Sequence, residues 1–198
     1  MERTEIIHIL GATFILSVAF GWAWKGMFAH PYPANFIFSF ITAIIAVGSG
    51  FILHELAHKY VAIRYHARAE FRASPVGLLI GLLFAIFNSP IIFALPGAVL
   101  IVGNEIDTRK NGIISVVGPL VNISLSILFL VLAIILSTIS QPEIATIAFI
   151  SSYINFILAL FNLIPVWELD GAKVLRWNRL LWASLFVPLA LIYLVIKF

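Results

Sequence analysis

The chain has 198 residues, of which 62% are hydrophobic and 11% are charged, and its formal net charge is +3. A water-soluble domain averages about a quarter charged residues, so this composition excludes a soluble globular protein, and its apolar content excludes a disordered chain. The absence of cysteine excludes disulfides, thiolate metal ligands and a cysteine nucleophile. We therefore expect an all-α polytopic membrane protein folded as a single domain.

Several apolar stretches are long enough to cross the bilayer, which takes about 20 residues of helix. Residues 6–24 are the first, and Trp22 and Trp24 at their end are typical of an interfacial aromatic belt. Residues 35–63 are the second stretch, and 113–138, 144–164 and 180–196 are three more. The sequence thus predicts about five to six transmembrane helices.

Residues 75–102 are apolar but ambiguous, because each half is too short to span and Asn88 to Pro90 break between the halves. We expect either a re-entrant pair or a membrane-inserted helix followed by a strand, and the alternative is a full span at 77–94. Asn111 and Gly112 then have turn chemistry between β-branched runs. These features predict a membrane-associated insertion with a β-hairpin around residues 98–116, and the segment Val166–Arg179 reads as a loop.

His54, Glu55 and His58 form an HExxH pattern late in the second span. Positions i and i+4 share one face of a helix, so two imidazoles can bind one metal while the carboxylate between them acts on water. Such groups are expensive in an apolar segment and are functional candidates by default. The plain alternative, a helix end that meets water at the interface, requires no particular spacing.

A catalytic zinc site that stays open to water needs a third protein ligand. Asp170 is the best candidate, because Pro165 and Gly171 break the helix around it and can fold irregular backbone into a protein-lined cavity. A helix N-cap or a solvated turn is the alternative for Asp170. The other imidazole and carboxylate groups considered are His8, His30, His66, Glu70, Glu105, Asp107, Glu143 and Glu168.

Two further motifs follow in order along the chain. Gly118–Asn122 read GPLVN, and Phe161–Gly171 read FNLIPVWELDG. Together with HELAH they resemble the site-2 protease family of intramembrane zinc metalloproteases, from about residue 40 to 176. The resemblance implies one membrane-embedded metalloprotease domain over 1–198 with its core at about 36–176, lacking the PDZ or CBS module of larger members.

This resemblance implies that His54, His58 and Asp170 bind one catalytic zinc ion and that Glu55 is the catalytic carboxylate. Asn162 stands where the family has an asparagine that holds the substrate or the developing oxyanion. The implied reaction is regulated intramembrane proteolysis, in which a peptide bond in or near the transmembrane segment of a membrane-protein substrate is hydrolysed in the lipid bilayer. A structural role is expected for the packing motif formed by Gly118, Pro119 and Asn122.

The proposed ligands constrain the topology, because His54 and Asp170 must lie at the same depth. An even number of crossings between them places ten of the 12 basic residues on one side, with only Lys25 and Lys197 opposite. The positive-inside rule then puts the metal site toward the cytoplasmic face. The basic residues lie at segment ends and form no extended stripe, so no nucleic-acid partner is expected.

Two other functions stay open from the sequence. A metal-binding membrane transporter would explain ligands within the membrane, but it gives Glu55 no required position between the histidines. A catalytically inactive family member acting as a scaffold is the second, and the intact Glu55 argues against it. Two imidazoles and a carboxylate also suit other divalent ions, although catalytic zinc is the commoner case.

Overall fold

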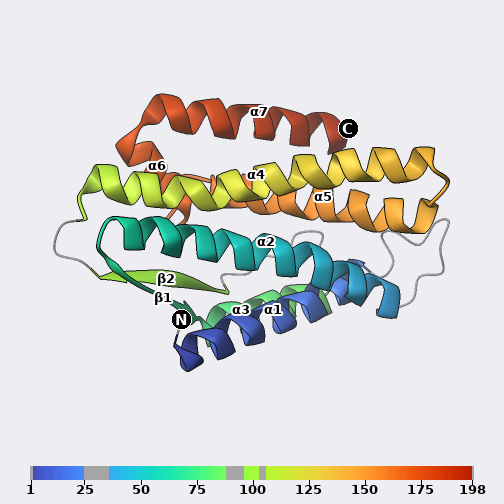
Figure 1. The fold of residues 1–198 in the computed structure, drawn as a ribbon, viewed down its shortest axis with the longest axis horizontal. Coiled ribbons are helices and arrows are strands. Elements are labelled where there is room, and N and C mark those ends of the chain that lie inside the picture. Colours follow the sequence, from blue (N-terminus) through green and yellow to red (C-terminus); the bar gives the residue numbers. More distant parts are fainter. Residues whose placement is uncertain (1, 25–35, 88–95, 103–105, 198) are drawn as a thin grey trace.

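The computed structural model describes residues 2–24, 36–87, 96–102 and 106–197. Its elements, in chain order, are α1 (Arg3–Trp24), α2 (Phe36–Arg64), β1 (Arg68–Ala73), α3 (Pro75–Ile86), β2 (Gly97–Val102), α4 (Thr108–Thr138), α5 (Pro142–Asn162), α6 (Asp170–Trp177) and α7 (Arg179–Lys197). The long helices lie side by side along the long axis of the molecule (Figure 1).

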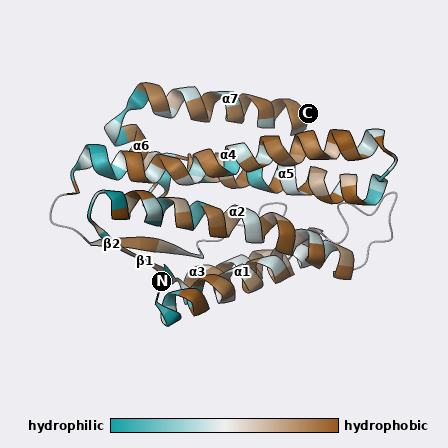
Figure 2. Ribbon diagram, viewed as in Figure 1, coloured by the Kyte–Doolittle hydropathy of each residue, from teal (hydrophilic) through white to brown (hydrophobic). Residues whose placement is uncertain are grey.

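Five helices within these residues, namely α1, α2, α4, α5 and α7, are long and apolar enough to cross a membrane. Their ribbons are hydrophobic over most of their length, and hydrophilic residues gather near the helix ends (Figure 2). An exposed apolar surface of this kind suits lipid and not water. The prediction of a predominantly helical multi-pass membrane protein is confirmed.

Helix α2 is central, because it packs against α1 on one side and against α4 and α5 on the other. The main core lies where α1, α2 and α5 meet, and its fully buried side chains include Val47 and Ile154. A second core joins α5 to α7 through Leu163 and Leu189. This arrangement leaves the last turns of α2 enclosed by neighbouring helices, and the HExxH residues lie there.

The insertion after α2 consists of a short helix between two paired strands. Strand β1 pairs antiparallel with β2, with Arg68 opposite Val102 and Ala73 opposite Gly97. Helix α3 has only 12 residues and starts at an N-cap, where the Ser74 side chain accepts a hydrogen bond from the backbone of Gly77 at 3.1 Å. Because the pairing returns residues 97–102 to the side of 68–73, it excludes a full span at 77–94.

The helix followed by a strand, one of the expected alternatives, is therefore confirmed, whereas the insertion of that helix into the membrane stays a prediction. The expected break at Asn88 to Pro90 lies outside the described residues. The hairpin predicted around 98–116 is wrong, because β2 ends at Val102 and Asn111 and Gly112 lie in the first turns of α4. The side chain of Asp107 caps that helix by accepting from the backbone of Lys110 at 2.7 Å.

Gly112 is needed for close packing and not for a turn. A Cβ built on it would lie 2.4 Å from the Cβ of Trp177, so α4 approaches α6 more closely here than a side chain would allow. The Asn-Gly pair that suggested a turn therefore lies in α4, and its glycine allows the close contact with α6.

Candidate metal centre

The HExxH residues lie in the last three turns of α2 and point into the protein. His54, Glu55 and His58 are all buried, with 5%, 7% and 7% of their surface exposed. The helical spacing of four residues brings the two imidazoles together as predicted, and their Nε2 atoms are 2.9 Å apart.

Asp170 reaches the histidines from the first position of α6. Helix α5 ends at Asn162, and the chain then turns back through Trp167, which has a positive φ of 52°. Gly171 permits this return, because a Cβ there would lie 2.1 Å from the carbonyl oxygen of Leu163. The segment Val166–Arg179 is therefore not the simple loop that was expected, since it contains α6.

The carboxylate of Asp170 completes a compact group with the two imidazoles. Its Oδ2 atom lies 3.2 Å from Nε2 of His54 and 3.1 Å from Nε2 of His58. Burial alone would raise the pKa of Asp170, but the adjacent His58 and His54 outweigh it, so this pKa lies below the ordinary aspartate value. The charged carboxylate therefore favours a positive charge beside it, which either a protonated imidazole or a metal ion can supply.

The Nδ1 atom of each histidine, on the side of the ring away from Asp170, has a hydrogen-bond acceptor. Nδ1 of His58 donates to the backbone carbonyl of Ile114 at 2.7 Å, and Nδ1 of His54 lies 2.6 Å from Oδ1 of Asn122. A proton on each Nδ1 leaves the Nε2 lone pairs free, which is the usual arrangement of metal-binding histidines. Three electron-pair donors therefore converge on one point.

This donor set fits a divalent cation. A tetrahedral zinc ion with bonds of about 2.0 Å to nitrogen and oxygen separates its ligand atoms by about 3.3 Å. The observed separations of 2.9, 3.1 and 3.2 Å are close to that value. Among the described residues, His54, His58 and Asp170 are the group of such side chains whose ligand atoms come together.

The GPLVN motif packs directly against the histidines and also provides a hydrogen-bond partner for one of them. A Cβ on Gly118 would lie 2.4 Å from Nε2 of His58 and 2.6 Å from Nε2 of His54, so only glycine admits the imidazoles here. Asn122 is fully buried and hydrogen-bonds His54. Sequence reasoning assigned Asn122 a structural role and missed this contact, although an amide within an apolar span is a recognisable signal.

Glu55 and Asn162 line the same cavity, which has a volume of about 880 Å³. Asn162 is the last residue of α5, and its amide nitrogen donates to the carbonyl of Leu158 at 3.0 Å. Strand β2 forms another wall of the cavity through residues 97–101. The arrangement therefore places a carboxylate, an amide and a strand around the three candidate ligands.

The other candidate ligands do not join this group. Glu168 lines the same cavity, but it is not among the side chains whose ligand atoms come together. Elsewhere in the described part of the chain lie His8, His66, Glu70, Asp107 and Glu143, and outside it lie His30 and Glu105. Two buried residues that sequence reasoning did not single out are Asn155, which contacts Asn122, and Glu5, which pairs with Lys59. Their polar character within apolar spans was the available signal.

Comparison with known proteins identifies the family. A protein of Methanocaldococcus jannaschii named "Putative zinc metalloprotease MJ0611" is 42% identical over 163 residues, which cover 82% of this chain and 83% of that protein. The chain belongs to the site-2 protease family of zinc metalloproteases. "Putative zinc metalloprotease Rip3" of Mycobacterium tuberculosis is 32% identical over 133 residues, which cover 65% of this chain.

The match covers only 29% of Rip3, so the likeness of this site-2 protease family member to Rip3 concerns a part of that protein. No family model matches the chain. No solved structure matches it either. The family membership therefore rests on the relative from Methanocaldococcus jannaschii, and the donor geometry of His54, His58 and Asp170 agrees with it.

Proposed function

We propose that this protein is an intramembrane zinc metalloprotease that hydrolyses a peptide bond in or near the transmembrane segment of membrane-protein substrates. The observation that carries the proposal is the convergence of His54, His58 and Asp170 beside Glu55 in one cavity of a multi-pass protein. A transport site would need ligands but no carboxylate fixed between the two histidines.

In the proposed reaction, the zinc ion and the side chains of the protein have different roles. When bound by the three ligands, zinc lowers the pKa of water and polarises a carbonyl group. Glu55 accepts a proton from the attacking water and later delivers it to the leaving nitrogen of the peptide. Asn162 donates to the substrate backbone or to the developing oxyanion after its amide leaves the carbonyl of Leu158.

A substrate helix must unwind before its peptide bonds can be attacked, since the helix hides them in its own hydrogen bonds. Strand β2 supports such unwinding, because one edge pairs with β1 and residues 97–101 line the cavity of the metal centre. An extended substrate segment would pair with this strand. The proposed edge thus lies on β2, and most of the segment expected to form the second strand of the hairpin lies in α4.

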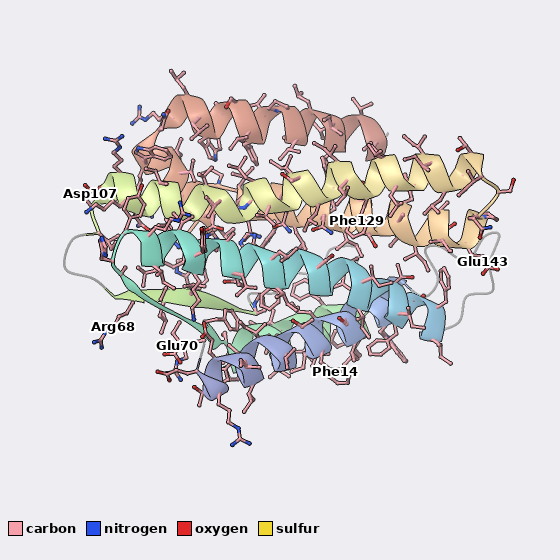
Figure 3. All side chains as sticks on the ribbon, in the orientation of Figure 1. Phe14, Arg68, Glu70, Asp107, Phe129 and Glu143 are labelled. Carbon is pink, nitrogen blue, oxygen red and sulfur yellow. The ribbon has the colours of Figure 1, made fainter. Side chains whose placement is uncertain are left out.

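We further propose that the metal centre faces the cytoplasm. Arg68 and Asp107 lie at one end of the helices, and Glu143 lies at the opposite end (Figure 3). Most of the basic residues lie at segment ends near Arg68 and Asp107. The positive-inside rule therefore favours the cytoplasm for this end of the helices. Helices α4 and α5 supply the two crossings that return Asp170 to the depth of His54.

The test compares the purified, zinc-loaded wild type with Glu55→Gln on a single-span substrate in a lipid bilayer. We expect the variant to bind zinc but to cleave about 10²- to 10⁴-fold more slowly, the range typical of a lost general base. Glu143→Gln is the matched control, because it makes the same change at the far, exposed end of α5 and should cleave at the wild-type rate.

Cleavage by Glu55→Gln at the wild-type rate would contradict the assigned role of Glu55. Zinc transport across the bilayer by a wild type that cleaves no substrate would favour the transporter instead. Zinc binding without either activity would favour the scaffold.

A further inference from the structure

Two asparagines are buried in the interior of the spanning helices, and neither belongs to the three ligands. Asn122 of α4 and Asn155 of α5 are both fully buried. A buried amide destabilises a protein unless its hydrogen-bonding groups are paired, so such residues persist where the partners are built into the fold. Here the partners form a continuous path from the backbone of α2 and α5 to His54.

The orientation of the Asn155 amide is determined by the backbone. Its Nδ2 atom donates to the carbonyl oxygen of Ser151 at 2.9 Å and to that of Ala46 at 3.3 Å. Carbonyl oxygens only accept hydrogen bonds, so the amide nitrogen must lie on this side. The Oδ1 atom of Asn155 must therefore point the other way, toward Asn122.

Asn122 then has a single favourable orientation. Its Nδ2 atom donates to Oδ1 of Asn155 at 3.0 Å and to the carbonyl oxygen of Gly50 at 3.2 Å. A rotated amide would bring its own oxygen against both of these oxygens. The Oδ1 atom of Asn122 is consequently directed at Nδ1 of His54, at 2.6 Å.

An acceptor at this position selects the His54 tautomer that carries its proton on Nδ1, and Nε2 keeps its lone pair for the metal. We propose that Asn155 is a positioning residue that sets the tautomer and ring orientation of His54 through Asn122. An effect of this positioning on catalysis rests on the proposed function above. His58 needs no such relay, because the carbonyl of Ile114 selects its tautomer directly.

Gly50 provides the space in which the relay forms. A Cβ at this position would lie 2.6 Å from Oδ1 of Asn155 and 3.2 Å from Nδ2 of Asn122. Gly50 lies one helical turn before His54, so the same turn of α2 supplies a carbonyl acceptor and a gap for the amides. A purely structural link between α2 and α5 would not require the two amides to be aligned toward the imidazole.

The test measures the tautomer directly by ¹⁵N and ¹³C NMR of labelled histidines in full-length, zinc-free protein that carries Asp170→Ala, because the Asp170 carboxylate lies 3.2 Å from Nε2 of His54 and would compete for the proton. We expect a single Nδ1-protonated form of His54 when Asn155 is kept, and zinc affinity is measured separately with Asp170 in place. Asn155→Leu should show a measurable population of the other tautomer and a zinc affinity about 10- to 100-fold lower, as for other partners that orient metal ligands. The tautomer of His58 should not change.

Ser152→Ala is the matched control, because it removes a hydrogen bond of 2.8 Å from α5 to the carbonyl of Ser126 in α4 and lies outside the relay. It should alter neither the tautomer nor the zinc affinity. If Asn155→Leu does not fold, Asn155→Ser serves instead, since a helical serine bonds the carbonyl four residues before it and does not reach Asn122.

A rescue separates positioning from packing. Both oxygens of a carboxylate accept hydrogen bonds, so Asn122→Asp combined with Asn155→Leu should restore the single Nδ1-protonated form of His54. A wild-type tautomer and zinc affinity in the single Asn155 variants would overturn the proposal. A shifted tautomer in a protein that cleaves no substrate would sustain the relay while contradicting the proposed function.

Discussion

The molecule contains two buried polar clusters that differ in how their charges are balanced. At the metal centre, His54, His58 and Asp170 direct three electron pairs at one point, and the imidazoles are held from outside by neutral amide and carbonyl groups. Near the start of α1, by contrast, the Glu5 carboxylate pairs with the ammonium group of Lys59. The first cluster could hold a metal cation, whereas the second contains a cation of its own.

The second cluster joins three elements of the fold. Glu5 of α1 is only 1% exposed, and besides Lys59 of α2 it accepts a hydrogen bond from the backbone N–H of Phe71 in β1 at 3.2 Å. It therefore fixes the position of the small sheet relative to the helices. Lys59 follows His58 directly in the sequence, but it belongs to a structural ion pair, whereas His58 belongs to the candidate metal site.

The largest effect on stability is expected from Lys59→Met, which leaves the Glu5 carboxylate buried without its counter-ion. Removing one partner of a buried ion pair typically destabilises a protein by about 3 to 5 kcal/mol. The free energy of unfolding, measured by denaturant titration in mixed micelles, should fall by that amount. The zinc affinity of the protein that remains folded should be unchanged.

The double variant Glu5→Gln with Lys59→Met removes both charges and should recover most of the lost stability, because no uncompensated charge remains. A double variant as unstable as Lys59→Met would show that the shape of the two side chains matters and not their charges. A large fall in zinc affinity in the folded single variant would erase the distinction between the clusters.

Gly118→Ala should break the other cluster. The added methyl group would lie 2.4 to 2.6 Å from the imidazole atoms of His54 and His58, so both rings must move from the positions that direct Nε2 at the metal. We expect the zinc affinity to fall by about 100-fold or more, beyond the range for a lost partner of a metal ligand. Competition with a chelator of known affinity would measure it.

Gly11→Ala is the control for Gly118→Ala, because a Cβ on Gly11 of α1 has no atom within 4 Å. It should leave zinc binding unchanged and slightly stabilise α1, since alanine is favoured over glycine in helices by up to about 1 kcal/mol. Equal zinc affinities for Gly118→Ala and wild type would mean that the close approach of α4 does not position the histidines.

The sequence alone predicted what depends on local pattern. The membrane spans follow from long apolar stretches, and the pairing of His54 with His58 follows from helical spacing. Asp170 could be chosen because Pro165 and Gly171 predicted a break in the helix around it, although Gly171 lies within α6. Local sequence patterns therefore predicted the membrane spans and the three candidate ligands.

Features that depend on contacts between distant segments could not be predicted in this way. The partner of β2 is β1, about 30 residues earlier, and a turn signal at Asn111 and Gly112 suggested a local hairpin instead. The Glu5–Lys59 pair joins residues 54 apart in the sequence. Asn122 was recognised in its motif, but only the packing of α4 on α2 shows that it contacts His54.

The smallest effect is expected from Glu70→Gln, which tests whether burial decides the importance of an ion pair. The guanidinium group of Arg72 lies 2.9 Å from the Glu70 carboxylate on β1, and these side chains are 47% and 29% exposed. Water and salt screen such a pair, so its loss should lower the free energy of unfolding by less than about 1 kcal/mol. A loss as large as that of Lys59→Met would mean that the small sheet depends on charge pairing at its surface as much as on its buried attachment to Glu5.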